Sequence, residues 1–95
     1  MVFGLVNMRR MLGKDAHEAR FGAIKPGDVV LLYWKAEDLA GKSQLESFWV
    51  DVSEVDGDQL MGVVDNIDLV CAPWRCGSRI HFKRNRIGDL IAHPA

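Results

Sequence analysis

The sequence has little of what marks most specialised classes of protein. Its 95 residues include only two cysteines, three prolines and one tyrosine. Two cysteines are too few for a disulfide framework. No apolar run comes near the roughly 20 residues that a membrane-spanning helix needs. A net charge of −1 also lacks the overall basic excess that is typical of nucleic-acid-binding domains.

The start of the chain lacks the features of a secretory signal. Arg9 and Arg10 follow the first apolar residues instead of preceding them, which is the wrong order for such a signal. Hydrophobic residues make up 48% of the chain, enough for a modest core. We therefore expect a small soluble domain that spans residues 1–95, is cytoplasmic and does not contact a membrane.

What is present is a strong hairpin signal in the stretch from Leu45 to Asn66. Two runs rich in β-branched and aromatic residues flank the Asp56-Gly57 step. Gly57 has no Cβ, so it adopts a positive φ at low cost, as a tight hairpin turn requires. Gly62 lies inside the second run, where a glycine indicates a bulge or a close backbone approach.

Alternation along the strands predicts which side chains face the core. In the first strand of the hairpin, Phe48, Val50 and Val52 should point inward, and Trp49 and Asp51 outward. Further inward sets are Leu60, Gly62 and Val64, then Ile80 and Phe82. The unbroken apolar run 29–34 predicts a central strand covered on both faces.

The remaining segments complete a fold prediction. Leu5, Met8 and Leu12 have helical spacing, so we expect a helix or helix pair over residues 3–20, weakened at Gly13. Short strands should follow over residues 28–92, including 67–71 and a final edge strand at 87–91. The expected fold class is α+β: an N-terminal helix packed on a curled antiparallel β-meander, a half-barrel of five or six short strands.

Charge is strongly segregated along the chain. Between Glu37 and Asp68 nine acidic residues accompany Lys42 alone, whereas Leu69 to Gly88 holds five basic residues and no acid. Two interpretations stay open. The two blocks lie side by side in the fold and neutralise each other, or the acidic block forms a face that meets a basic partner.

The order of several features resembles the YegJ-like group, a family of small bacterial domains of unknown function. The resemblance spans residues 16–91 and rests on the following positions: Ala16, Ala19, Arg20, Phe21, Phe48, Trp49, Val50, Val52, Gly62, Asn66, Trp74, Gly77, Ile80, Phe82, Ile87 and Asp89. The chain departs from the family pattern at Asp68, where a proline is usual, and at Leu90, where a tryptophan is usual. The resemblance implies a compact α+β domain with a link to bacterial toxin-immunity loci, and no catalytic residue.

Residues suited to catalysis or metal binding are few and poorly spaced. Cys71, Cys76, His81 and His93 are of the types that bind zinc, but the spacing is wrong for a zinc knuckle. Buried or half-buried free thiols are the interpretation that we favour for the two cysteines. An acid pair at Asp65 and Asp68 has little support, since acids are common in turns. We predict a protein that is not an enzyme and binds no metal or cofactor.

Binding to another protein is the function that we expect. Aromatic anchors within a charged rim concentrate binding energy in small interfaces. The candidate residues for a basic protein partner are Trp49, Asp51, Glu54, Asp56 and Asp58. Small size and the acidic segment favour a bacterial or phage inhibitor or immunity-type protein.

Two alternatives remain. One is a nucleic-acid-binding module that uses residues of the basic stretch 74–86, namely Trp74, Arg79, His81 and Lys83. The other is a structural subunit, a homodimer that pairs through an edge strand such as 87–91.

Overall fold

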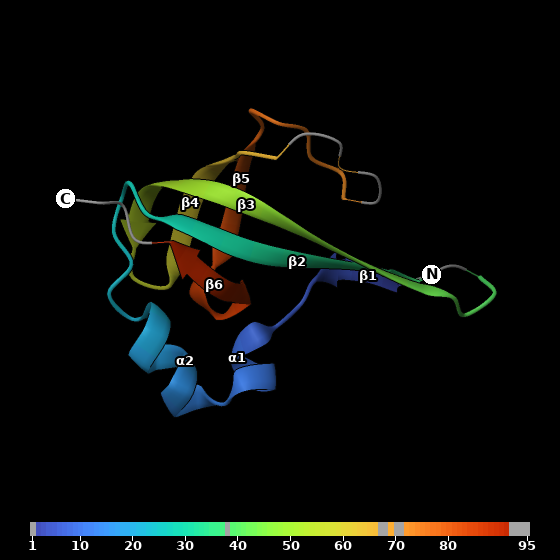
Figure 1. Cartoon of the computed structure of the whole chain (residues 1–95), viewed down its shortest axis with the longest axis horizontal. Helices are drawn as coiled ribbons and strands as arrows, with labels where there is room; N and C mark the ends of the chain where they lie inside the picture. Colours follow the sequence, from blue (N-terminus) through green and yellow to red (C-terminus); the bar gives the residue numbers. More distant parts are fainter. Residues whose placement is uncertain (1, 38, 67–68, 70–71, 92–95) are drawn as a thin grey trace.

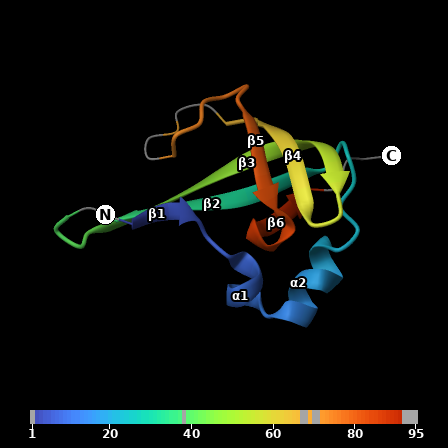
Figure 2. The same cartoon turned by 180° about the vertical axis from the view of Figure 1, so that it is seen from behind.

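Two short helices pack against a curled antiparallel sheet of six strands (Figures 1 and 2). The computed structural model describes residues 2–37, 39–66, 69 and 72–91. The expected fold class is confirmed, because the N-terminal helices accompany an antiparallel half-barrel. In chain order the elements are β1 (Val2–Leu5), α1 (Met8–Leu12), α2 (Lys14–Phe21), β2 (Val29–Glu37), β3 (Ser43–Asp56), β4 (Gln59–Val64), β5 (Arg79–Lys83), the 3-10 helix η1 (Arg84–Arg86) and β6 (Ile87–Ile91).

The sheet is a meander that returns to its first long strand. Strands β2, β3, β4 and β5 pair in sequence order, and β6 then pairs with the first half of β2. The second half of β2 pairs with β1, so two strands share one edge of β2. Because β6 closes back onto β2, the sheet curls around one core.

The start of the chain is a strand, not a helix. The prediction of helix from residue 3 was wrong, because Val2–Leu5 pairs with residues 34–37 of β2. The helix begins after Asn7, whose side chain accepts a hydrogen bond from the Arg10 N–H (3.1 Å) and so caps α1. Gly13, at φ +92°, separates α1 from α2, which confirms the expected helix pair.

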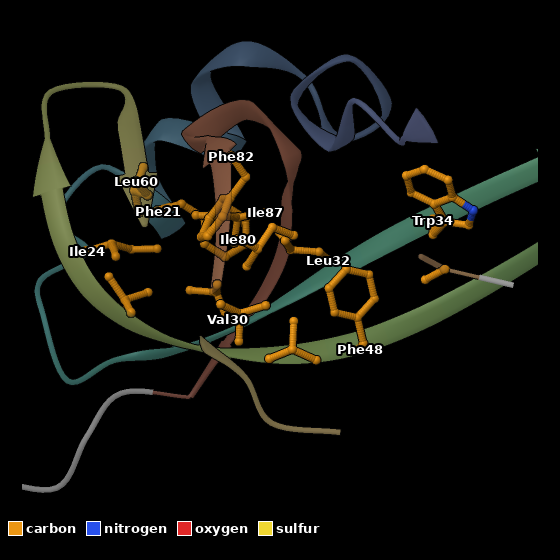
Figure 3. Close-up of a cluster of buried hydrophobic side chains, with 14 residues drawn as sticks. Phe21, Ile24, Val30, Leu32, Trp34, Phe48, Leu60, Ile80, Phe82 and Ile87 are labelled. Carbon is orange, nitrogen blue, oxygen red and sulfur yellow. The ribbon is translucent and has the colours of Figure 1, made fainter. Parts of the chain in front are cut away.

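The core lies inside the curl of the sheet (Figure 3). Phe48, Val50 and Val52 are buried, as are Leu60, Val64, Ile80 and Phe82, so the inward sets expected from alternation are confirmed. Helix α2 adds Phe21, which is fully buried among them. The helices therefore close one end of the half-barrel.

Strand β2 is central, but only one of its faces is interior. Val30, Leu32 and Trp34 are buried, whereas Val29, Leu31 and Tyr33 are half-buried. Coverage of both faces was expected and is not what the structure shows. Met8 and Met11 of α1 line a hollow together with Tyr33, so the helix covers the outer face of β2 only in part.

Strand length also differs from expectation, since β3 has 14 residues and is not short. With β1 and the far end of β2, it projects as a three-stranded arm (Figure 1). The molecule measures 45 × 30 × 20 Å, which reflects that arm. The predicted strand over 67–71 lies outside the described residues apart from Leu69. Within the described ranges, no helix has the length and apolar character needed to cross a membrane.

Candidate functional site

The outward side of β3 holds four of the five residues predicted to bind a protein. Asp51, Glu54 and Asp56 are exposed, and Trp49 is half-buried on the same side of the strand. We call these three carboxylates with Trp49 the acidic strip. The placement of Trp49 and Asp51 on the outer face was predicted from alternation, and it is confirmed.

A bulge at Ser53 explains why the strip is continuous. In the β3–β4 ladder Val52 pairs with Gly62 and Glu54 pairs with Met61, so Ser53 is the extra residue. One extra residue shifts the alternation by one position. Glu54 and Asp56 therefore point outward together with Asp51, although their parity along the chain differs.

Trp49 is set among apolar neighbours on the outer face. Its cross-strand partner is Leu31, and the next row across the sheet places Val29 and Val63 on either side of Asp51. All three of these apolar residues are half-buried. The sequence reading missed them, because a continuous apolar run looks the same whether one face of the strand is covered or both.

The backbone at Trp49 is held from the segment after β4. The Trp49 N–H donates to Asn66 Oδ1 (2.6 Å), and the Trp49 carbonyl accepts from the Asp65 N–H (2.9 Å). These bonds extend the ladder by one step beyond β4. The backbone from which the indole projects is therefore held by hydrogen bonds on this side as well as by the pairing with β2.

Asp58 does not join the acidic strip. It follows Gly57 in the two-residue turn between β3 and β4, where Gly57 has a φ of +59°, as the hairpin signal predicted. Its carboxylate accepts from Arg84 Nε (3.4 Å) on the helix side of the molecule and is 87% exposed. The turn thus separates Asp58 from the other four candidates.

Part of the acidic block and part of the basic block lie on one face of the sheet, with β4 between them. The cross-strand rows are Asp51–Val63–Arg79, Glu54–Met61–His81 and Asp56–Gln59–Lys83. Arg79, His81 and Lys83 are exposed, as alternation predicted, and form a basic strip along β5. Since neighbouring strands are about 4.8 Å apart, the two strips run roughly 10 Å apart.

The gap between the strips is shallow and bounded by both charges. A hollow of about 220 Å³ lies over β4, with Glu54 and Asp56 on one side, His81 on the other and Met61 between them. Two strips of opposite sign side by side display both charges and leave the face close to neutral overall. Part of each block thus lies side by side, as the first interpretation expects, and contact of the acidic face with a basic partner stays a prediction.

Trp74 is separated from the basic strip. Its ring lies edge-on to Trp34 (centroids 5.1 Å apart) and tilted against Phe48 (5.5 Å). The residue is half-buried and packs against the core. The structure therefore brings Arg79, His81 and Lys83 together but directs Trp74 to the opposite face of the sheet.

His17 is buried in α2 without a partner suited to catalysis. Its Nε2 lies 2.9 Å from the Ile87 carbonyl oxygen, and its ring packs edge-on against Phe21. Burial lowers the pKa of His17 below 6.5, opposed by the bond to the Ile87 carbonyl, while the positive charges of Arg9 and Arg84 lower it further and Glu18 raises it. We therefore interpret His17 as a neutral imidazole whose contact with the Ile87 carbonyl joins α2 to β6.

The described residues contain no group of three or more His, Cys, Asp or Glu side chains that would hold a metal ion. Cys76 is an exposed free thiol, so the expectation of a buried or half-buried thiol was wrong at that position. It lies in the turn before β5, where side chains project from the fold. Cys71, Asp68 and His93 lie outside the described residues.

The final strand was correctly placed over Ile87–Ile91, and it pairs with β2 on one side. Both helices contact β6. A homodimer that pairs through this strand stays a prediction.

Comparison with known proteins finds no matching family model, no matching curated protein and no matching solved structure. The resemblance to the YegJ-like group therefore stays a prediction.

Proposed function

We propose that this chain is a small, non-enzymatic protein-interaction module that binds a partner with a basic surface through the acidic strip. The supporting observation is the outward placement of Trp49, Asp51, Glu54 and Asp56 along one strand, made continuous by the bulge at Ser53. We further propose a bacterial or phage inhibitor or immunity-type role, for which small size and a rigid acidic face are suited.

In this proposal the indole supplies apolar contact area and the carboxylates supply charge. A half-buried tryptophan among Val29, Leu31 and Val63 offers apolar area that a partner covers, the usual source of affinity in a hot spot. Exposed carboxylates beside it accelerate encounter with a basic surface and select against acidic ones. Asp58 contributes only to the electrostatic potential around the strip, because its carboxylate is directed toward Arg84 beside the helices.

The test compares partner capture by three proteins immobilised at equal density. The first is the wild type, the second carries Trp49→Ala with Asp51→Asn, and the third carries Leu39→Ala with Asp15→Asn. The third is the matched control, since it removes one exposed apolar side chain and one exposed carboxylate elsewhere. We expect the wild type and the control to retain the same basic proteins, identified by mass spectrometry, and the second variant to lose them.

A second strip-directed variant guards against a folding defect at Trp49. Asp51→Asn, Glu54→Gln and Asp56→Asn together change only exposed side chains, and circular dichroism checks the fold of each protein. Loss of capture with intact folding supports the proposal. Undiminished capture by both strip variants contradicts it.

Nucleic-acid binding is a second candidate, favoured by the exposed row of Arg79, His81 and Lys83 on β5. The acidic strip roughly 10 Å away opposes the approach of phosphates. A gel-shift series with single-stranded DNA at rising salt discriminates between the two functions. Binding that weakens steeply with salt and is lost in Arg79→Gln with Lys83→Gln would favour this candidate over the acidic strip.

A further inference from the structure

A basic hollow on the helix side is separate from both strips on the sheet. It has a volume of about 340 Å³ and is lined by Asn7, Arg9, Arg10, Gly13, Lys14 and Asn85. Residues from α1, the link to α2 and η1 therefore meet there, although Asn85 is far from the others in sequence. Its lining includes three cationic side chains and no carboxylate.

Two of the three cations have no counter-ion among the residues that the structure describes. The Arg10 and Lys14 side chains are exposed and make no ion pair with any residue that the structure describes. Arg9 pairs with Glu18 through Nη2 (3.2 Å), which uses one of the three nitrogens of its guanidinium. Like charges gathered in a hollow create a positive potential that draws in an anion.

Two buried polar atoms on lining residues have no hydrogen-bond partner among the residues that the structure describes. They are Arg9 Nε, a donor, and Asn85 Oδ1, an acceptor. A buried polar group without a partner is costly, and an ordered water or a ligand group is what usually satisfies it. The oxygen and nitrogen of an amide exchange by a half turn, so Asn85 can present its NH₂ group at the same place. Both positions then donate hydrogen bonds.

The hollow is held in shape by contacts that do not use these groups. Asn7 caps α1 through its side chain, and the Gly13 N–H donates to the Arg9 carbonyl (2.9 Å). Arg86 Nη1 donates to the Leu5 carbonyl (2.9 Å) and so fixes η1 relative to the start of α1. The backbone that carries Arg9 and Asn85 is therefore held in place before any ligand arrives, whereas the exposed Arg10 and Lys14 side chains become ordered on binding.

We propose that this hollow binds an oxyanion, a phosphate or carboxylate group, through Arg9 Nε, the Asn85 amide, Arg10 and Lys14. A planar guanidinium and an amide donate to separate oxygens of such a group, and the two exposed cations supply charge. The site is independent of the proposed function, since it lies on other elements and takes a ligand of the opposite sign from a basic partner.

The experiment is a titration of the ¹⁵N-labelled full chain with inorganic phosphate at low ionic strength, followed by NMR. We expect saturable shifts at Arg9, Arg10, Lys14 and Asn85 with a dissociation constant of about 1 mM. Arg10→Gln with Lys14→Gln should weaken binding about five- to tenfold. Asn85→Ala should also weaken it, and the Asn85 side-chain NH₂ signals should move in the wild type.

The matched control is Arg79→Gln with Lys25→Gln, which removes the same charges from exposed positions elsewhere. It should leave phosphate affinity unchanged. Parallel titrations with succinate and with chloride identify the chemical group that binds. Saturation by phosphate or succinate at the hollow supports an oxyanion site. The anion with the lower dissociation constant shows whether the site prefers a phosphate or a carboxylate group. Shifts spread evenly over basic residues without saturation, or equal weakening in the control, overturn the proposal.

Discussion

Gly62 occupies the point where β3 and β4 approach most closely beside the Ser53 bulge. A Cβ built there would lie 2.5 Å from the Asp51 carbonyl oxygen and 2.5 Å from Val50 Cγ1. The first of these is a backbone atom within a paired strand, so it cannot move away without disturbing the ladder. The close approach expected from a glycine inside a strand is therefore confirmed.

We predict that Gly62→Ala lowers the free energy of unfolding by about 1–3 kcal/mol, as for other overpacking substitutions. Gly4→Ala in β1 is the control, because no atom lies within 4 Å of a Cβ at that position. Its effect should stay within about 0.5 kcal/mol. Urea denaturation measures both, and equal stabilities for the two variants would show that the close approach does not constrain the fold.

His17 makes folding stability depend on pH. Because burial lowers its pKa in the folded protein below 6.5, the unfolded chain binds more protons than the folded chain below that value. Arg9 and Arg84 face the ring and add to the effect, whereas Glu18 and the Ile87 carbonyl oppose it. Stability from this group is therefore complete above pH 6.5 and is lost as pH falls.

We predict that the free energy of unfolding decreases between pH 7 and pH 5, by at most about 1.4 kcal/mol per pH unit for this proton. His17→Gln should flatten that decrease. Denaturation series at several pH values provide the measurement. An unchanged slope in His17→Gln would assign the pH dependence to another group.

At the scale of elements, Arg84 joins α2 to the β3–β4 turn. Its Nη1 donates to the carbonyls of Phe21 (2.8 Å) and Gly22 (3.3 Å), and its Nη2 donates to the Gly57 carbonyl (2.5 Å). The side chain is only 15% exposed. One planar group thus satisfies carbonyls at the end of a helix and in a hairpin turn, a geometry that an ammonium group cannot reproduce.

We predict that Arg84→Lys lowers the free energy of unfolding by about 2 kcal/mol, since partly buried carbonyls lose their donors. Arg79→Lys, on the exposed side of β5, should change it by less than about 0.5 kcal/mol. Hydrogen exchange by NMR adds a local readout, and the amides of α2 should lose protection first. A neutral Arg84→Lys result would mean that other contacts, among them those of Phe21 and His17 and the Arg20–Asp89 ion pair (2.8 Å), are enough to hold the helices.

The elements that the sequence predicted well are those with local signals. The Asp56-Gly57 turn and the period-two patterns of β3, β4 and β5 depend on neighbouring residues, and each is present as expected. Strand β1 depends instead on pairing with residues 34–37, which no local pattern reveals. Because Leu5 and Met8 have helical spacing, the predicted helix began at residue 3, whereas α1 begins at Met8.

For the candidate site too, local patterns predicted some features and long-range pairing decided the others. Alternation identified the outward side of β3 but gave no register, so the rows that place β4 between the two charged strips could not be foreseen. Nor could the separation of Asp58 and Trp74, which are directed elsewhere by contacts with Arg84 and with Trp34. Long-range contacts decide these positions.

The residues that the structure describes include three charged regions in a fixed arrangement. The acidic strip on β3 and the basic strip on β5 share the outer face of the sheet, and the basic hollow lies beside the helices. A partner that approaches the acidic strip therefore meets carboxylates first and cations only beyond β4. This order favours a basic surface narrow enough to cover β3 without reaching β5.

The acidic strip is tested most directly by mapping the bound partner onto the sheet. Titration of the ¹⁵N-labelled chain with the captured partner, followed by NMR, reports each amide and the Trp49 indole N–H separately. The account predicts that the largest shifts occur at Trp49, Asp51, Glu54 and Asp56, with small shifts at Asp58 and in α1. Shifts concentrated on β5 or around the helices, with Trp49 unchanged, would contradict it.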